Sequence, residues 1–103
     1  MKERIATVIQ DRNGIVFLPN ESEPYTGIYE EYDSDGHKRA QETYKDGKLN
    51  GLLTLWHENG QKMMEKKFKD GKESGLATSW HENGQKKDET QLPQFHELII
   101  PTE

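Results

Sequence analysis

A heptapeptide, Trp-His-Glu-Asn-Gly-Gln-Lys, occurs twice in this chain, at Trp56–Lys62 and at Trp80–Lys86, so that the two copies begin 24 residues apart. The same shift aligns a third, more divergent copy that begins at Tyr32. A period of this length is typical of repeat architectures, in which each unit buries its apolar face against its neighbours. The heptapeptide is therefore predicted to be part of a scaffold, and not a catalytic motif in duplicate.

Glycines, aromatic residues and lysines coincide when the sequence is shifted by this period. The coincident sets are Gly27, Gly51 and Gly75; Tyr32, Trp56 and Trp80; Gly36, Gly60 and Gly84; Lys38, Lys62 and Lys86; and Gly47 and Gly71. Glycine accepts the positive φ values that tight turns require. The glycines of the repeats that follow Asn or Asp are therefore predicted to be structural turn residues: Gly36, Gly60, Gly84, Gly47 and Gly71.

Each unit has the pattern of a β-hairpin. In the second unit, the β-forming run Leu52–Trp56 is followed by the turn Glu58-Asn59-Gly60 and then by the run Gln61–Phe68. The turn fits a three-residue loop, a type I turn with glycine in the left-handed region, and a two-residue type I′ turn is the alternative. Lys69-Asp70-Gly71 offers the same turn chemistry at the other end of the unit. The sequence thus predicts an all-β fold, an antiparallel meander of stacked hairpins.

The length fits one domain. Within it we expect an N-terminal capping hairpin, in which residues 4–9 and Ile15–Leu18 supply the strands, then three repeats and a tail. The expected divisions are 1–26 for the cap, 27–50, 51–74 and 75–92 for the repeats, and 93–103 for the C-terminal tail. An atypical unit at each end is what a repeat array needs to close its exposed faces.

The composition is unusual for a compact globule, because 30% of the residues are apolar and 32% are charged. Typical domains contain roughly 45–50% apolar and about 25% charged residues. A disordered chain and a thin folded sheet both fit these values, but disorder predicts few aromatics and little regularity. The aromatic residues here recur at fixed intervals, which favours an ordered protein with a small core.

The charges exclude some functions. The net charge is −5, and no run of lysine and arginine forms a basic stripe, so we do not expect nucleic-acid binding. The absence of cysteine excludes disulfides and cysteine-ligated zinc and fits a reducing compartment. No segment resembles a signal peptide or is long and apolar enough to span a bilayer. A soluble, cytoplasmic protein is expected.

Alternation along the first strand of the second unit places Leu52, Thr54 and Trp56 on one face of the sheet. This Leu/Thr/Trp face is kept in the third unit, whereas the opposite face changes from leucines to Ala77 and Ser79. We therefore expect the kept face to be the covered one. Tyr32, Trp56 and Trp80 should form a stripe on it, which either packs against lysine stems or methionines of the intervening strands or binds a partner protein.

The polar residues of the repeats do not suggest chemistry. His57 and His81 should lie two strands apart, roughly 9.5 Å, which is too far for a compact metal site with Asp33. Glu58 and Glu82 belong to exposed turns, where nothing tunes a carboxyl pKa for catalysis. No serine lies in a G-x-S-x-G motif. We expect no enzyme activity, no cofactor and no metal.

Five lysines gather in the second unit: Lys62, Lys66, Lys67, Lys69 and Lys72. They are typical of a solvated face that protects a sheet from edge-to-edge aggregation. A surface for acidic lipid is the other interpretation. Interspersed acidic residues, among them Glu65 and Glu73, argue against membrane association.

The repeated pattern resembles the MORN repeat, and most closely its bacterial variant with units near 24 residues. The pattern is a glycine, an aromatic residue five positions later, Asn-Gly or Asp-Gly, a lysine, and a closing Tyr/Phe-Lys-Asp-Gly-Lys. The resemblance covers Tyr25 to about Glu89 and is strongest in "GLLTLWHENGQKMMEKKFKDGK" and "GLATSWHENGQKK". It implies an elongated, twisted antiparallel sheet and no chemistry, because the shared residues are turn glycines and packing aromatics.

The resemblance also carries functional expectations. Some bacterial members are described as antitoxins or immunity-like partners of toxins, and eukaryotic members act as scaffolds linked to phospholipid binding. We therefore expect a non-catalytic protein-binding module, the antitoxin or immunity partner of a toxin, with a scaffold on anionic membrane surfaces as the alternative. A homodimer through edge strands or through the "ELII" segment of the C-terminal tail is also expected.

Overall fold

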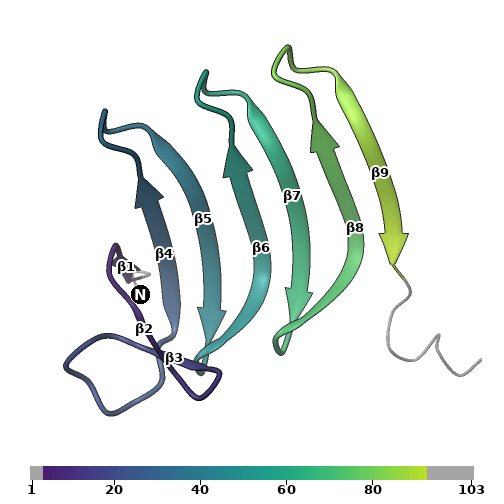
Figure 1. The fold of residues 1–103 in the computed structure, drawn as a ribbon. Coiled ribbons are helices and arrows are strands. Elements are labelled where there is room, and N and C mark those ends of the chain that lie inside the picture. The colour runs from purple at the N-terminus through teal and green to yellow at the C-terminus, as the bar shows by residue number, and fades with distance from the viewer. Residues whose placement is uncertain (1–3, 93–103) are drawn as a thin grey trace, which may run out of the picture.

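The computed structural model describes residues 4–92 and contains only strands as regular elements within that range (Figure 1). The strands are β1 (Ile5–Ala6), β2 (Gln10–Arg12), β3 (Ile15–Phe17), β4 (Gly27–Tyr32), β5 (Lys38–Lys45), β6 (Lys48–Trp56), β7 (Lys62–Lys69), β8 (Lys72–Trp80) and β9 (Lys86–Leu92). The all-β prediction is confirmed.

One sheet of seven strands runs through the described part of the molecule in the order β1-β4-β5-β6-β7-β8-β9. From β4 onward every neighbour is also the next strand in the sequence and pairs in the antiparallel sense, as Figure 1 shows. The radius of gyration is 15.8 Å, against about 13 Å for a compact domain of this length. The elongated hairpin meander is therefore as the sequence predicted.

The Asn-Gly turns contain three residues. His57 and Gln61 close the β6–β7 turn, since the His57 amide donates to the Gln61 carbonyl at 2.8 Å, and the Gly60 amide donates to the His57 carbonyl at 3.0 Å. Gly60 has a φ of 90°, as the left-handed position of this turn requires. Of the two alternatives that the sequence left open, the three-residue loop is the one that forms.

The Asp-Gly turns at the opposite end of the sheet are shorter. Lys69 and Lys72 face each other as a cross-strand pair, which leaves two residues in the loop. Both loop residues have positive φ, 51° for Asp70 and 85° for Gly71, which is the type I′ conformation. Both ends of the unit thus use glycine in the left-handed region, as the sequence predicted, and the Asp-Gly loop is one residue shorter than the Asn-Gly loop.

Each hairpin carries a β-bulge beside its aromatic residue. In the second unit Leu55 pairs with Met64 while Trp56 pairs with Lys62, so that Met63 is the additional residue. The first and third units have the same irregularity, with Arg39 in the place of Met63 in the first. A bulge of this kind re-aims the side chains beside it.

The N-terminal cap differs from the sequence prediction in its strands. The hairpin joins β2 to β3, with Gln10 opposite Phe17, and residues 4–9 are not its first strand. Instead β1 lies parallel to β4 at the edge of the main sheet, with Ile5 opposite Ile28. Polar Gln10-Asp11-Arg12 forms the strand because Asn13-Gly14 provides the turn, with φ values of 57° and 88°.

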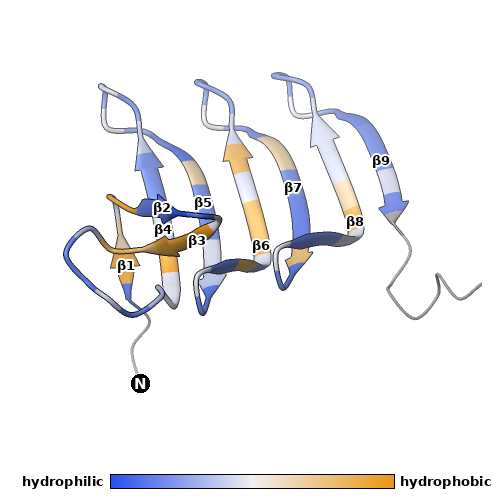
Figure 2. Ribbon diagram, turned by 60° about the horizontal axis from the view of Figure 1, so that its bottom comes forward, coloured by the Kyte–Doolittle hydropathy of each residue, from blue (hydrophilic) through white to orange (hydrophobic). Residues whose placement is uncertain are grey.

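The core lies where this hairpin crosses the first unit. Val16, Tyr25 and Tyr44 are buried together, and Tyr29 and Leu49 pack against them. The hairpin is fastened there by backbone bonds: the Val16 amide donates to the Gly47 carbonyl at 2.9 Å, and the Tyr25 amide donates to the Val16 carbonyl at 2.8 Å. Figure 2 shows β2 and β3 lying across the ends of β4 and β5.

The covered face is not the one that the sequence predicted. Cross-strand partners share a face of a sheet, and Tyr29 pairs with Glu42, which pairs with Leu53. The N-terminal hairpin therefore covers the face of Leu53, which we call the core face. On the other side, called the aromatic face because it carries the tryptophans, Leu52 is 48% exposed and Leu76 is 43% exposed.

The prediction failed because alternation reports which residues share a face and not which face is covered. The aromatic face is partly packed, since Thr54 and Thr78 are buried on it. The predicted repeats 27–50, 51–74 and 75–92 overlap the hairpins β4–β5, β6–β7 and β8–β9, but β6 and β8 begin at Lys48 and Lys72, before the predicted boundaries. The expected C-terminal tail, 93–103, lies outside the described residues.

Gly47→Ala should destabilise the protein by about 2–4 kcal/mol. The added Cβ would meet the Ile15 side chain and lie 3.0 Å from the Val16 carbonyl, and the φ of +82° strains any side chain. Gly36→Ala is the matched control, since its φ is +85° but nothing lies within 4 Å. It should cost only about 1 kcal/mol. Urea unfolding of both variants measures the difference, and equal losses would contradict the cap's packing on Gly47.

Candidate functional site

Tyr32, Trp56 and Trp80 are the last residues of β4, β6 and β8, and we call them the aromatic row. Each pairs with the lysine that begins the next strand: Tyr32 with Lys38 and Trp56 with Lys62, and Trp80 likewise in the third unit. The tryptophans are half-buried, whereas Tyr32, at the start of the row, is 46% exposed.

A lysine of each unit lies over the tryptophan of the following unit. The Lys38 ammonium is 5.5 Å from the centroid of the Trp56 ring, and the Lys62 ammonium is 5.8 Å from that of Trp80. A cation over an aromatic face is attracted to the ring at these distances. The strand between thus supplies a lysine to each tryptophan, with the ammonium over the ring where the sequence predicted packing of the aliphatic stem, and this contact links successive repeats.

Carboxylates and amides hold these lysines in place. Lys38 Nζ binds Glu30 at 3.1 Å and Gln41 at 2.9 Å, and Lys62 Nζ binds Glu65 at 2.9 Å. The Tyr32 hydroxyl donates to Glu30 at 2.7 Å, and this bond, with that from Lys38, lowers the pKa of the Glu30 carboxyl. The aromatic row is therefore bordered by fixed ion pairs.

Two hollows open beside the tryptophans at positions one repeat apart. The first has a volume of about 500 Å³ and is lined by Gly36, His37, Lys38, Trp56, Glu58, Asn59 and Gly60. The second has a volume of about 240 Å³ and is lined by Gln61, Lys62, Trp80 and Gly84. The second set consists of residues equivalent to members of the first, so the aromatic face is hollowed periodically.

His57 is a link between repeats. Its Nε2 lies 2.9 Å from the Trp80 carbonyl oxygen. Beside it, the Asn59 side-chain amide donates to the Glu82 carbonyl at 2.7 Å. A histidine that binds a backbone carbonyl in this way needs no metal to explain its position.

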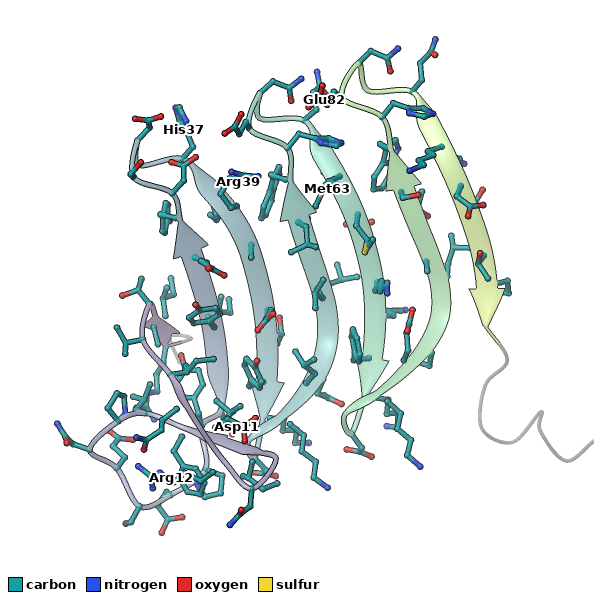
Figure 3. All side chains as sticks on the ribbon, in the orientation of Figure 1. Asp11, Arg12, His37, Arg39, Met63 and Glu82 are labelled. Carbon is teal, nitrogen blue, oxygen red and sulfur yellow. The ribbon has the colours of Figure 1, made fainter. Side chains whose placement is uncertain are left out.

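The first unit makes the same link with different residues. Asp33 replaces the histidine there and cannot donate, but Arg39 Nε donates to the Trp56 carbonyl at 3.0 Å. The guanidinium also lies 3.7 Å from Asp33 Oδ2. Figure 3 shows Arg39 and Met63 near the same end of β5 and β7. The bulge position thus supplies an arginine in the unit that lacks the histidine.

The sequence reasoning missed Arg39. The available signal was the paired difference between units: Asp33 with Arg39 in the first, His57 with Met63 in the second. From the second unit to the first, the histidine donor is lost and an arginine donor appears six residues later. This paired difference indicates that both side chains bind the same acceptor. The acceptor is a backbone carbonyl, and only the pairing register reveals it.

Asp33, Asp35 and His37 form the one cluster of metal-ligating groups found in residues 4–92, with ligand atoms within 4.8 Å of one another. The Asp33 carboxylate is already engaged, since it accepts hydrogen bonds from the His37 amide at 3.0 Å and the Asp35 amide at 2.9 Å. These bonds, that from His37 most of all, hold the pKa of Asp33 below its ordinary value. The hydrogen bonds of the turn therefore account for the proximity of these three side chains.

Two of the five lysines of the second unit form ion pairs with carboxylates of the same unit. Lys62 binds Glu65, and Lys66 lies 3.5 Å from Glu73. Glu58 and Glu82 are exposed, as the sequence predicted for turn residues. Between residues 4 and 92 there is also no helix long and apolar enough to cross a membrane.

Comparison with known families supports the repeat interpretation. Residues 25–46 and 49–70 each match the MORN repeat variant. The matched stretches correspond to the hairpins β4–β5 and β6–β7, so each match spans one hairpin with its three-residue turn. MORN repeats are in general binding modules and not catalytic domains. No curated protein and no solved structure matches the chain.

The third hairpin, β8–β9, lies outside the two matched stretches but continues the MORN geometry. Gly75 pairs with Leu92 as Gly51 pairs with Phe68. The Gly84 amide donates to the His81 carbonyl at 2.9 Å, which repeats the turn of the second unit. The array described here therefore has three structurally equivalent hairpins.

Asp33 should contribute to stability only while it is ionised. Because its folded pKa is lower than its unfolded pKa, its contribution is complete above the unfolded value and is lost as the pH falls through the folded value. Asp33→Asn keeps an acceptor but cannot ionise. Urea unfolding between pH 2 and 6 should show a wild-type advantage that disappears at the acid end, and an advantage independent of pH would contradict the assignment.

Replacing the link of the first unit by that of the second should restore stability. Arg39→Met removes the donor to the Trp56 carbonyl and should cost about 1 kcal/mol. Asp33→His in the same chain supplies the donor that His57 provides one repeat later. A double-mutant cycle by urea unfolding should give a favourable coupling of about 1 kcal/mol. Strictly additive losses would show that the two links are not equivalent.

Proposed function

We propose that this protein is a non-catalytic protein-binding module and that its partner docks on the aromatic face. The observation that carries the proposal is the position of the exposed apolar side chains. Among the described residues of the repeats, the large exposed hydrophobics are Tyr32, Leu52 and Leu76, and all three lie on the face of Trp56 and Trp80.

Several features support a protein partner over a small ligand. The aromatic row and the two leucines extend over all three hairpins, and a surface of this length suits a macromolecule. The hollows beside Trp56 and Trp80 are open and repeat along the array. Tryptophan and tyrosine are the residues that most often anchor protein interfaces. The face is also free of the N-terminal hairpin, which packs on the other side.

The finer proposal is that the partner is a toxin and that binding neutralises it. It rests on the resemblance of the repeats to those of antitoxin and immunity-like proteins, and not on a feature of the site. A scaffold on anionic membranes is the alternative. The ion pairs Lys62–Glu65 and Lys66–Glu73 offset the positive charge on which such binding depends, so we prefer the protein partner.

Leu52→Ala with Leu76→Ala should weaken partner binding without unfolding the protein. Both side chains are exposed, so stability should change by no more than about 1 kcal/mol in all. Loss of two apolar contacts should cost about 2 kcal/mol of binding, roughly a factor of 30 in Kd. The measurement is affinity capture of a specific protein from the native extract, followed by titration of the purified partner.

The matched control is Ile5→Ala with Val8→Ala, which removes two exposed apolar side chains, 62% and 61% exposed, from the N-terminal segment. This variant should bind as the wild type does. Equal affinity of all three proteins would refute the aromatic face as the docking surface. Identification of the captured protein as a toxin, with inhibition in a toxicity assay, tests the finer proposal.

A further inference from the structure

At the end of the sheet that carries the three-residue turns, side-chain contacts across each boundary between repeats run from one unit to its C-terminal neighbour. At the second boundary, His57 reaches the Trp80 carbonyl and Asn59 donates to the Glu82 carbonyl. Lys62 lies over the Trp80 ring. The preceding unit supplies the donors and the cation, and the following unit supplies the carbonyls and the aromatic ring.

The last unit carries the same donors without a following unit in the described chain. His81, Asn83 and Lys86 are the equivalents of His57, Asn59 and Lys62. No hydrogen bond joins the His81 ring to any residue between 4 and 92, and within that range no aromatic ring lies beneath Lys86. The outer edge of β9 likewise has no strand beside it among those described, as Figure 1 shows.

We propose that the outer edge of β9 binds an antiparallel β-strand of a partner protein. The contacts inside the array indicate what that strand contains. Across the boundary between β7 and β8, Met64 pairs with Ser79 and Glu65 pairs with Thr78, and the next residue of β8 is Trp80. By analogy, two residues of the docking strand lie opposite the β9 positions that are equivalent to Glu65 and Met64. The next residue of the docking strand is aromatic and lies beneath Lys86.

Charge specifies the two residues that precede the aromatic. Asp88 and Glu89 of β9 are the equivalents of Met64 and Glu65, and both are exposed. Glu89 binds Lys86 at 2.8 Å, as Glu65 binds Lys62, so Asp88 carries the larger part of the charge selection. Opposite charges stabilise directly opposed positions in a sheet, and like charges destabilise them. The strand that fits has basic residues at these two positions. Figure 2 shows that β9 is hydrophilic along its length, in contrast to β6, so charge and backbone hydrogen bonds dominate this edge.

Head-to-tail stacking of a second copy of this chain, with its β4 beside β9, does not fit the edge. Its exposed first unit would bring Glu30 opposite Glu89 and Glu31 opposite Asp88, which places like charges together twice. In addition, β1 already occupies part of the outer edge of β4, at Ile28 and Tyr29. The same acidic residues that select a basic partner strand therefore disfavour head-to-tail stacking of copies.

The inference rests on the proposed protein-binding function but uses a different surface. Three synthetic peptides test it: the β8 sequence Leu76–Asn83, the same peptide with Thr78→Lys and Ser79→Lys, and the same peptide with Thr78→Glu and Ser79→Glu. Each is titrated into the full-length protein labelled with ¹⁵N. The amide shifts should concentrate on His81–Leu92, and the lysine peptide should bind about tenfold more tightly than the glutamate peptide.

A charge reversal on the protein sharpens the test. In the variant Asp88→Lys with Glu89→Lys the order of the lysine and glutamate peptides should invert. The matched control is Glu31→Lys with Asp35→Lys, which changes the net charge equally at the other end of the array and should leave the order unchanged. An order that does not invert would overturn the charge selection.

Other outcomes would overturn the proposal outright. Equal binding of all three peptides, or shifts outside His81–Leu92, would remove the edge as a docking site. Protection of the outward-facing β9 amides from hydrogen exchange before any peptide is added would mean that residues 93–103 or a second copy occupy it, and sedimentation equilibrium separates these two. Leu52→Ala with Leu76→Ala should not change peptide binding, so failure at β9 is distinguishable from failure at the aromatic face.

Discussion

The register of the hairpins is the constraint on which the rest of this structure depends. A three-residue turn at one end and a two-residue turn at the other fix which residues oppose each other, and a slip of one residue would exchange the two faces. With this register, the lysine after each of the first two three-residue turns, Lys38 and Lys62, pairs with one aromatic residue and lies over the ring of the next. A sheet without a second layer has few buried side chains, so these contacts between repeats provide the stabilisation that a hydrophobic core provides in other folds.

The two faces of the sheet serve different purposes. The N-terminal hairpin closes the core face over the first unit, where Tyr25 is fully buried and burial raises the pKa of the Tyr44 hydroxyl. The aromatic face keeps its leucines exposed although their pattern persists through the repeats. A pattern retained without burial suggests a surface maintained for contact with another molecule, which is why the proposed function uses that face. The cap and the docking surface can coexist because they lie on opposite sides.

The ends of the array explain the differences between its units. In the first unit Asp33 and Arg39 replace the histidine link, and acidic residues gather around the exposed Tyr32. In the last unit, His81 and Lys86 are equivalent to the residues that supply a hydrogen-bond donor and a cation to the next unit at the earlier boundaries. A repeat protein with complementary ends would polymerise, and the acidic residues at both ends oppose this. The proposed docking of a basic strand at β9 rests on the same charges.

The sequence alone determined the repeat, the hairpins, the turn glycines and the equivalence of Tyr32, Trp56 and Trp80, because period and turn chemistry are local properties of the chain. It also predicted that the tryptophans pack against a methionine or a lysine stem of the strands between, and the structure places a lysine ammonium over each tryptophan ring. Only the tertiary structure decided which face is covered, that β1 pairs with β4, and that Arg39 takes the place of His57. Those outcomes depend on where the N-terminal segment packs and on which carbonyl a donor reaches across a strand boundary. Such contacts join residues that are distant in the chain, and the period of the sequence does not predict them.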